Sequence, residues 1–164
     1  MNGIIIKNLS DIPAKQEKTH PLYEHRKSEV TDSRYKYEAA SPSGGNQTVV
    51  AFYTLPPGKS AYPFHYHTAN EEVFYIISGN ATLETFEREI PLCPGDVIVC
   101  PAGKAGAHKL TNASETEDLV YLDVDTNNTP DIAYYPHSNT VGIRAAGGIR
   151  DNFRLDGGVG YPYE

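Results

Sequence analysis

The chain has 164 residues, of which 39% are hydrophobic and 21% charged, and its formal net charge is −7. This length and composition suit one globular domain. The sequence has no basic stripe that would neutralise phosphates and no apolar run long enough for a spanning helix, so we expect neither a nucleic-acid partner nor a membrane partner.

The N-terminus and the cysteines indicate the compartment. Residues 1–7 lack the charged-then-apolar layout of a secretory signal. The two cysteines, Cys93 and Cys100, form no Cys-x-x-Cys pair and are too few for a disulfide scaffold. We therefore expect a cytoplasmic protein with two ordinary strand thiols.

The first 47 residues are polar and charged and end in a loop signal at 41–46. The apolar segment Gly3–Lys7 is the exception within this N-terminal arm. We expect it to form an outer strand that covers a sheet edge of a second copy.

Residues 48–125 alternate short apolar runs with turn residues. Many strands of this length at close intervals favour a β-sandwich or barrel, and no run offers three turns of helical periodicity. The expected strands are 48–55, 62–67, 72–78, 81–86, 89–92, 96–100, 107–112 and 118–125.

Residues 126–164 change character, with repeated Tyr, Pro and Gly, as in Tyr134-Tyr135-Pro136 and Tyr161-Pro162-Tyr163. We expect an extended C-terminal tail that packs on the barrel. The predicted organisation is therefore an arm (1–47), a barrel (48–125) and a tail (126–164).

Three polar residues at the centre of the chain suggest a metal site. Side chains alternate faces along a strand, so His65 and His67 point the same way. Glu72 begins the next strand after a short turn, and pairing of the two strands would bring its carboxylate close to both imidazoles. Two imidazoles and one carboxylate are ligands that first-row divalent metals accept, whereas a single core histidine is more often only hydrogen-bonded.

A later histidine, His108, lies at the start of another predicted strand and supplies a further ligand. The remaining histidines, His20, His25 and His137, fall in polar segments outside the strand block. We expect these three to be solvated surface residues.

The two clusters resemble the paired signature motifs of the cupin superfamily. Gly58, His65, His67, Glu72 and Gly79 occupy the places of the first motif, and Gly95, Pro101, Gly103, His108 and Asn112 those of the second. The spacing departs from the family pattern by one residue before His65 and by a longer gap between Gly103 and His108. The resemblance is strong over residues 48–125.

This resemblance implies an all-β, double-stranded β-helix (a jelly-roll barrel). It also implies one divalent transition metal (Mn, Fe, Ni or Zn) held by His65, His67, Glu72 and His108, and a homodimer. Strand parity places Phe74 and Ile76 on the face of Glu72, and Leu110 on that of His108, so we expect these three to form an apolar wall for a small-molecule ligand. The alternative for all three is ordinary barrel core, and the parity of Tyr53, Tyr62 and Tyr121 stays open.

Three functions are compatible with such a site, and the sequence assigns no catalytic residue. The first is a metalloenzyme acting on a small polar or aromatic molecule, of the oxygenase or isomerase type. The second is a non-catalytic module that binds a sugar or a carboxylate. The third is a structural cupin whose metal holds the barrel together, since one fold hosts many functions.

Overall fold

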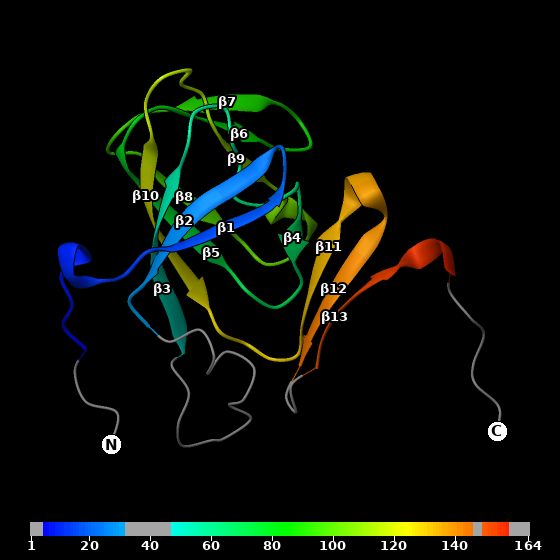
Figure 1. Ribbon diagram of the computed structural model, residues 1–164. Coiled ribbons are helices and arrows are strands. Elements are labelled where there is room, and N and C mark those ends of the chain that lie inside the picture. The colour runs from blue at the N-terminus through cyan, green and yellow to red at the C-terminus, as the bar shows by residue number, and fades with distance from the viewer. Residues whose placement is uncertain (1–4, 32–46, 146–148, 158–164) are drawn as a thin grey trace, which may run out of the picture.

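The computed structural model describes residues 5–31, 47–145 and 149–157. Within them the chain forms thirteen β-strands and four single-turn 3₁₀-helices (Figure 1). None of the helices in these residues is long and apolar enough to cross a membrane. The 3₁₀-helices are η1 (Leu9–Asp11), η2 (Lys104–Gly106), η3 (Pro136–Ser138) and η4 (Leu155–Gly157).

The largest sheet has six strands in the order β1-β2-β3-β10-β5-β8, and every neighbouring pair is antiparallel. Side chains of β3 and β10 alternate between buried and less buried positions over eight residues each, because one face of the sheet lies on the core. The strands are β1 (Lys15–His20), β2 (Tyr23–Glu29), β3 (Thr48–Leu55), β10 (Leu119–Thr126), β5 (Glu72–Ser78) and β8 (Val97–Cys100).

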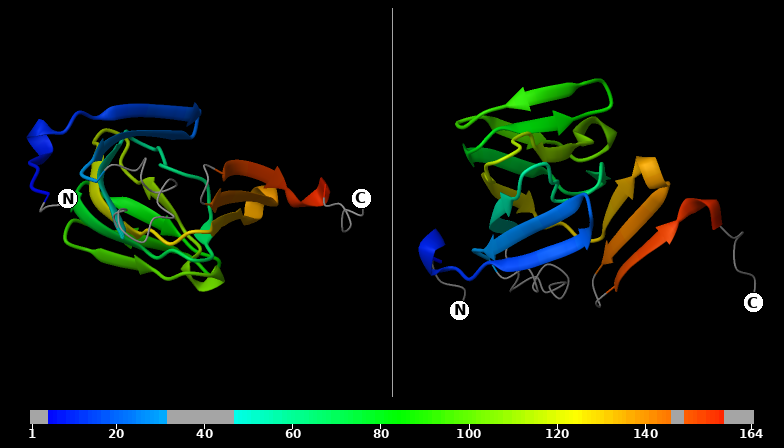
Figure 2. Two further views of the ribbon diagram at one scale, coloured as in Figure 1. Left: turned by 90° about the horizontal axis from the view of Figure 1, so that it is seen from below. Right: turned by 45° about the horizontal axis from the view of Figure 1, so that its top comes forward.

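Two smaller sheets complete the molecule. One has the order β7-β6-β9, from β7 (Glu89–Leu92), β6 (Ala81–Glu84) and β9 (Lys109–Asn112). The other, called here the C-terminal sheet, has the order β13-β12-β11-β4, from β13 (Ile149–Arg154), β12 (Thr140–Ala145), β11 (Asp131–Tyr135) and β4 (Tyr66–His67). Figure 2 shows β12 and β13 projecting beside the barrel.

The core lies between the six-stranded sheet and β6 and β9. Its fully buried side chains include Leu55, Ile76 and Leu119, which pack with Tyr53, Phe74, Leu83, Leu110 and Tyr121. Two isolated β-bridges, Ser60–Thr111 and His65–His108, connect the segment between β3 and β4 to β9 and the residue before it. The fold is a double-stranded β-helix barrel, and the all-β prediction is confirmed.

Two motif glycines are required by the turns that they form. Gly79 has φ +83°, and a Cβ there would stand 2.7 Å from the carbonyl oxygen of Asp118. Gly103 has φ +89°, and its N–H donates to the carbonyl of His67 at 2.7 Å. Only glycine adopts such backbone conformations freely, so these residues shape turns of the barrel rather than react.

The two ends of the chain differ from the expectation. Strands β1 and β2 of the predicted arm extend the same sheet as β3 and β10. In the expected edge strand Gly3–Lys7, residues 5–7 have no strand structure, and residues 3 and 4 lie outside the described residues. The predicted extended tail contains β11 to β13, and β11 pairs with β4. Backbone pairing of residues far apart in sequence, which local patterns do not reveal, accounts for both differences.

Candidate metal centre

Three strand segments bring the four predicted ligands together. His67 ends β4, Glu72 begins β5, and His65 and His108 form an antiparallel bridge. His65 N donates to His108 O at 3.0 Å, and His108 N donates to His65 O at 2.9 Å. This exchange fixes the register of His108, with the longer gap before it accommodated by the single-turn helix η2.

The carboxylate of Glu72 lies at the centre of the three imidazoles. Its Oε1 is 3.6 Å from His67 Nε2, and its Oε2 is 3.4 Å from His108 Nε2 and 4.0 Å from His65 Nε2. His65, His67 and Glu72 each offer a ligand atom within 4.8 Å of the other two. The geometry therefore brings together all four residues singled out in the sequence.

The other ring nitrogen of each histidine already has a partner. His65 Nδ1 lies 2.8 Å from Pro63 O, and His108 Nδ1 lies 2.9 Å from Gly106 O. Because a carbonyl only accepts, each ring donates from Nδ1 and directs its Nε2 at Glu72. Metal-binding histidines are oriented in this way in general.

The third histidine is oriented by Asp131, a residue that the sequence did not single out. His67 Nδ1 lies 2.5 Å from Asp131 Oδ2, while Asp131 Oδ1 accepts the Ala69 N–H at 3.0 Å. Burial raises the pKa of the Asp131 carboxyl, but the bonds from His67 and Ala69 outweigh it, and the pKa is lowered. Asp131 is 64 residues from His67, and only the pairing of β11 with β4 brings it near.

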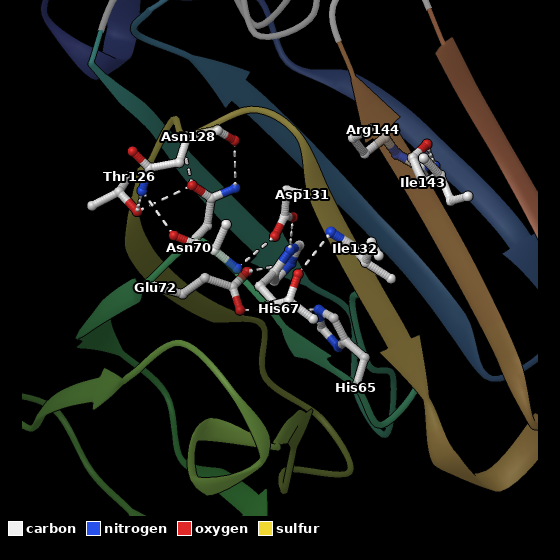
Figure 3. A network of polar contacts seen from close by, with 12 residues as sticks. His65, His67, Asn70, Glu72, Thr126, Asn128, Asp131, Ile132, Ile143 and Arg144 are labelled. Atoms are coloured by element: carbon white, nitrogen blue, oxygen red, sulfur yellow. Dashed lines mark hydrogen bonds and ion pairs between the residues drawn. The ribbon is translucent and has the colours of Figure 1, made fainter.

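The turn between His67 and Glu72 is held by the buried side chain of Asn70 (Figure 3). Asn70 Oδ1 accepts from Asn128 N at 2.6 Å and from Thr126 Oγ1 at 3.2 Å, and its Nδ2 donates to Asn128 O at 3.2 Å. These bonds attach the turn to the end of β10 and to the residues that follow it. The positions of His67 and Glu72 are therefore fixed together.

A cavity of about 340 Å³ opens onto the cluster, and His65, His67 and Glu72 line it. Most of its other lining side chains are polar or charged. They are Lys15, Glu17, Lys27, Glu29, Tyr53, Tyr62, Asp123, Asp125, Asp131, Tyr135, Arg144 and Arg150, with Val49 and Ala133. The expected apolar wall does not line this cavity.

The residues predicted for that wall lie deeper. Phe74 and Leu110 line a second pocket of about 20 Å³ that also contacts His65, Glu72 and His108. Ile76 is 0% exposed, belongs to the core and lines neither cavity. Strand parity placed these side chains on the inward face, but the inward face at their positions is mostly filled by core packing.

The prediction that His25 is a surface residue is wrong. His25 is 2% exposed and packs against the rings of Tyr53 and Tyr62, with centroids 5.1 and 5.2 Å away. Burial is the main cause that lowers its pKa. His20 and His137 are exposed as expected. In β2 the buried residues are His25 and Ser28, three apart, and the other five are half-buried, so no period-two alternation signals the burial of His25.

Of the tyrosines whose parity the sequence left open, Tyr53 and Tyr121 are buried, whereas Tyr62 is 38% exposed. The hydroxyls of Tyr53 and Tyr62 lie 3.2 Å apart, and the rings of Tyr53 and Tyr121 stack at 5.2 Å. Asp123, on the same face of β10 as Tyr121, is 7% exposed, and its Oδ1 has no hydrogen-bond partner among the described residues. This wall of the cavity is therefore rich in hydroxyl and carboxyl groups.

Comparison with known proteins identifies the fold family. Residues 51–125 match the family described as "Cupin domain", and this range contains both clusters. This range is a conserved-barrel cupin domain. This cupin is also similar in fold to the crystal structure of a sugar phosphate isomerase of the cupin superfamily from Silicibacter pomeroyi, with a TM-score of 0.74 and 23% identity over 92% of each chain.

Two curated relatives are more similar in sequence over shorter spans. Quercetin 2,3-dioxygenase from Bacillus subtilis is 32% identical over 48% of this cupin and 23% of its own length. An oxalate-binding protein from Thermotoga maritima is 33% identical over 43% of this cupin and 54% of its own length. The chain therefore spans about a quarter of the first relative and about half of the second.

Proposed function

We propose that His65, His67, Glu72 and His108 hold one divalent transition metal, and that the protein is a metalloenzyme acting on a small polar or aromatic molecule by oxygenation or isomerisation. The observation that carries the proposal is the convergence of three imidazole Nε2 atoms on the Glu72 carboxylate. Each ring has its Nδ1 occupied by an acceptor, which leaves Nε2 for the metal.

The residues fit a metal in charge and in donor type. Three neutral imidazoles and one carboxylate suit manganese, iron, nickel or zinc, and donor type alone does not choose among them. Without an ion, a carboxylate and three nitrogen lone pairs would face one another in a largely buried site, which is unfavourable. A cation at the point of convergence would relieve that repulsion.

A bound metal supplies Lewis-acid or redox chemistry at positions that the four ligands leave open. The chain's own residues would perform the remaining tasks. Asp131 holds the His67 ring, and Asn70 fixes the turn that sets the separation of His67 and Glu72. Tyr62 and Asp123 line the cavity beside the cluster, where they can exchange hydrogen bonds with a bound molecule.

The non-catalytic alternative uses the same site to hold a sugar or a carboxylate. The relative named an oxalate-binding protein favours it, whereas the relative named quercetin 2,3-dioxygenase favours catalysis. A structural role for the metal is the third possibility. The cavity of about 340 Å³ favours ligand access over that role, since pockets of this size accommodate small molecules.

In the deciding experiment, metal-loaded protein is incubated with a panel of sugars, hydroxy acids and aromatic phenols. Oxygen uptake is followed with an electrode and isomer formation by chromatography. Turnover that disappears in Glu72→Gln supports the enzyme. Thermal stabilisation by a ligand without turnover, about 2.7 kcal/mol at a hundredfold excess over Kd, supports the binding module. Neither response, together with a large loss of melting temperature on chelation, would indicate the structural role.

We also propose a homodimer. The outer face of β5 and β8 exposes Tyr75, Ile77, Val97 and Val99, and β8 is an edge strand of its sheet. Apolar side chains on a free sheet edge favour association. Light scattering after size exclusion tests this: a mass of two chains is expected, and one chain at every concentration contradicts it. The cytoplasmic location stays a prediction.

A further inference from the structure

The C-terminal sheet presents arginines on the same face as the metal-site residues. In antiparallel strands, directly opposed residues share a face, and so do residues two apart on one strand. Asp131 of β11 is opposite Arg144 of β12, and Arg144 is opposite Arg150 of β13. One row across three strands therefore runs from the carboxylate that holds His67 to two guanidinium groups, and all three residues line the cavity.

The guanidinium of Arg144 is held in place by uncharged acceptors. Its Nη1 donates to Ile143 O at 2.9 Å (Figure 3). The same atom donates to Asp151 O at 3.3 Å, and Nη2 lies 3.4 Å from Asn152 Oδ1. All three acceptors are neutral, and no carboxylate of the described residues pairs with Arg144. By contrast, Lys15 and Lys27 both pair with Glu29, at 2.9 and 3.6 Å.

The sheet leaves room for this guanidinium. A Cβ at Gly142 would stand 3.2 and 3.3 Å from the two terminal nitrogens of Arg144 and 2.6 Å from Asn152 Oδ1. Gly142 thus lets the Arg144 head group lie close to the strand. Arg150 lies directly opposite Arg144 on β13, so it brings a second positive charge to the same row.

The inner wall of the same cavity suits a hydroxyl group of a ligand rather than an anion. Asp123 Oδ1 is buried and has no hydrogen-bond partner among the described residues, and Asp123 lines both the larger and the smaller cavity. A buried polar atom without a partner is costly, and a hydroxyl group of a ligand would satisfy it. Tyr53 and Tyr62 add hydroxyls to this wall.

We propose that the cavity binds a small hydroxylated molecule with a terminal oxyanion, a carboxylate or a phosphate, which Arg144 and Arg150 bind while its hydroxyl groups face Asp123 and the metal centre. The inference rests on the proposed function only for the metal end of the ligand. An arginine fork matches a planar carboxylate or a phosphate in two hydrogen bonds, which gives both affinity and orientation.

The test compares three probes that offer a metal the same carboxylate and neighbouring hydroxyl. D-erythronate has an uncharged far end, 4-phospho-D-erythronate carries a phosphate there, and tartrate carries a carboxylate. Calorimetric titration is performed on metal-loaded and on chelator-treated protein. We expect at least one doubly anionic probe to bind about tenfold or more tightly than erythronate, which corresponds to one charge-assisted contact. The phosphate and carboxylate arms identify the oxyanion.

Variants assign the effect to the arginine. Arg144→Gln should abolish the preference for the doubly anionic probe and leave erythronate binding unchanged, whereas Arg88→Gln, at an exposed turn distant in sequence, should keep it. Gly142→Ala should weaken the preference by displacing the guanidinium. Equal binding of all three probes, no binding of any, or a preference that persists in Arg144→Gln overturns the inference. If the protein binds no metal but the chelator-treated protein still prefers the doubly anionic probe, the metal proposal is overturned and the anion inference stands.

Discussion

Asp131 Oδ2 lies 2.5 Å from His67 Nδ1, across 64 residues of sequence. The contact connects the C-terminal sheet to the candidate metal centre, because Asp131 begins β11 and His67 ends β4, and these two strands pair. A carboxylate behind a metal-binding histidine fixes the tautomer and raises the basicity of the ring. The C-terminal sheet is therefore a part of the site.

Replacing Asp131 tests this relationship. In Asp131→Asn the side-chain oxygen can still accept the Ala69 N–H, but the amide nitrogen turned toward His67 only donates. The ring would then carry its proton on Nε2, the atom that faces Glu72. We expect metal affinity to fall about 10- to 100-fold with little change in the fold.

Competition with a fluorescent chelator measures that affinity. The control is Asp151→Asn, which makes the same chemical change on exposed β13 and should leave affinity unchanged. Equal affinity of Asp131→Asn and the unchanged protein would show that Asp131 does not orient a metal ligand.

The turn glycine Gly79 should tolerate no side chain. Gly79→Ala introduces a Cβ at 2.7 Å from Asp118 O at positive φ, whereas Gly58→Ala has a similar φ but open space around the new atom. Both changes strain the backbone, and only the first adds a clash with the main chain. We expect Gly79→Ala to lose about 1–3 kcal/mol more of unfolding free energy than Gly58→Ala in urea denaturation. Similar losses would contradict the packing of this turn.

The buried His25 should make stability depend on pH. Burial lowers its pKa in the folded chain from 6.5, so below about pH 6.5 the unfolded chain binds the proton more readily. The neutral ring therefore costs no stability above pH 6.5, and stability is lost as the pH falls from 6.5 toward the lower folded pKa. His25→Gln should flatten this part of the curve relative to the unchanged protein.

Chemical denaturation of chelator-treated protein from pH 8 to pH 5 provides the data, and His20→Gln, at an exposed position, is the control. The same slope in all three proteins would mean that His25 is not buried in the neutral form.

Cys100 reports the parity of β8, and Cys93, which precedes this strand, is an exposed reference. Cys93 is exposed, whereas Cys100 is buried opposite Glu72, and burial together with Glu72 and Asp123 raises the pKa of its thiol to about 12. Thiolates are the reactive form, and Asp96 raises the pKa of the exposed Cys93 thiol, so iodoacetamide at pH 8 should label Cys93 in the folded protein at a reduced rate and Cys100 only after unfolding. Mass spectrometry of Cys93→Ser isolates the slow site. Rapid labelling of that variant in native buffer would place Cys100 outside the barrel.

Much of the barrel could be predicted from the sequence, because the patterns that indicate strands and turns are local. Period-two alternation and turn glycines predicted the strands at 72–78 and 89–92 with the bounds that the structure has. The ligand set was also recognisable, since His65 and His67 share a strand face and Glu72 follows one turn later. The partners that hold this set were not recognisable, because Asp131 reaches His67 only through a pairing of distant strands.

The cavity lining shows the same limit. Parity correctly turned Phe74 and Leu110 inward, but it did not distinguish core from pocket, and Ile76 lies in the core. Apart from Glu72, the charged residues that line the larger cavity come from β1, β2, β10 and the C-terminal sheet. Whether such a strand faces a cavity depends on its neighbours in the sheet, which one sequence does not disclose.

The central claim is that one metal ion is bound where four side chains converge. Plasma mass spectrometry of the purified protein, reconstituted in turn with manganese, iron, nickel and zinc and then desalted, measures this most directly. We predict about one ion per chain for at least one metal, with loss of that ion in His67→Ala and His108→Ala and its retention in the exposed-site control His20→Ala. Retention of the ion in His67→Ala and His108→Ala, or no stoichiometric ion in any preparation, would contradict the account.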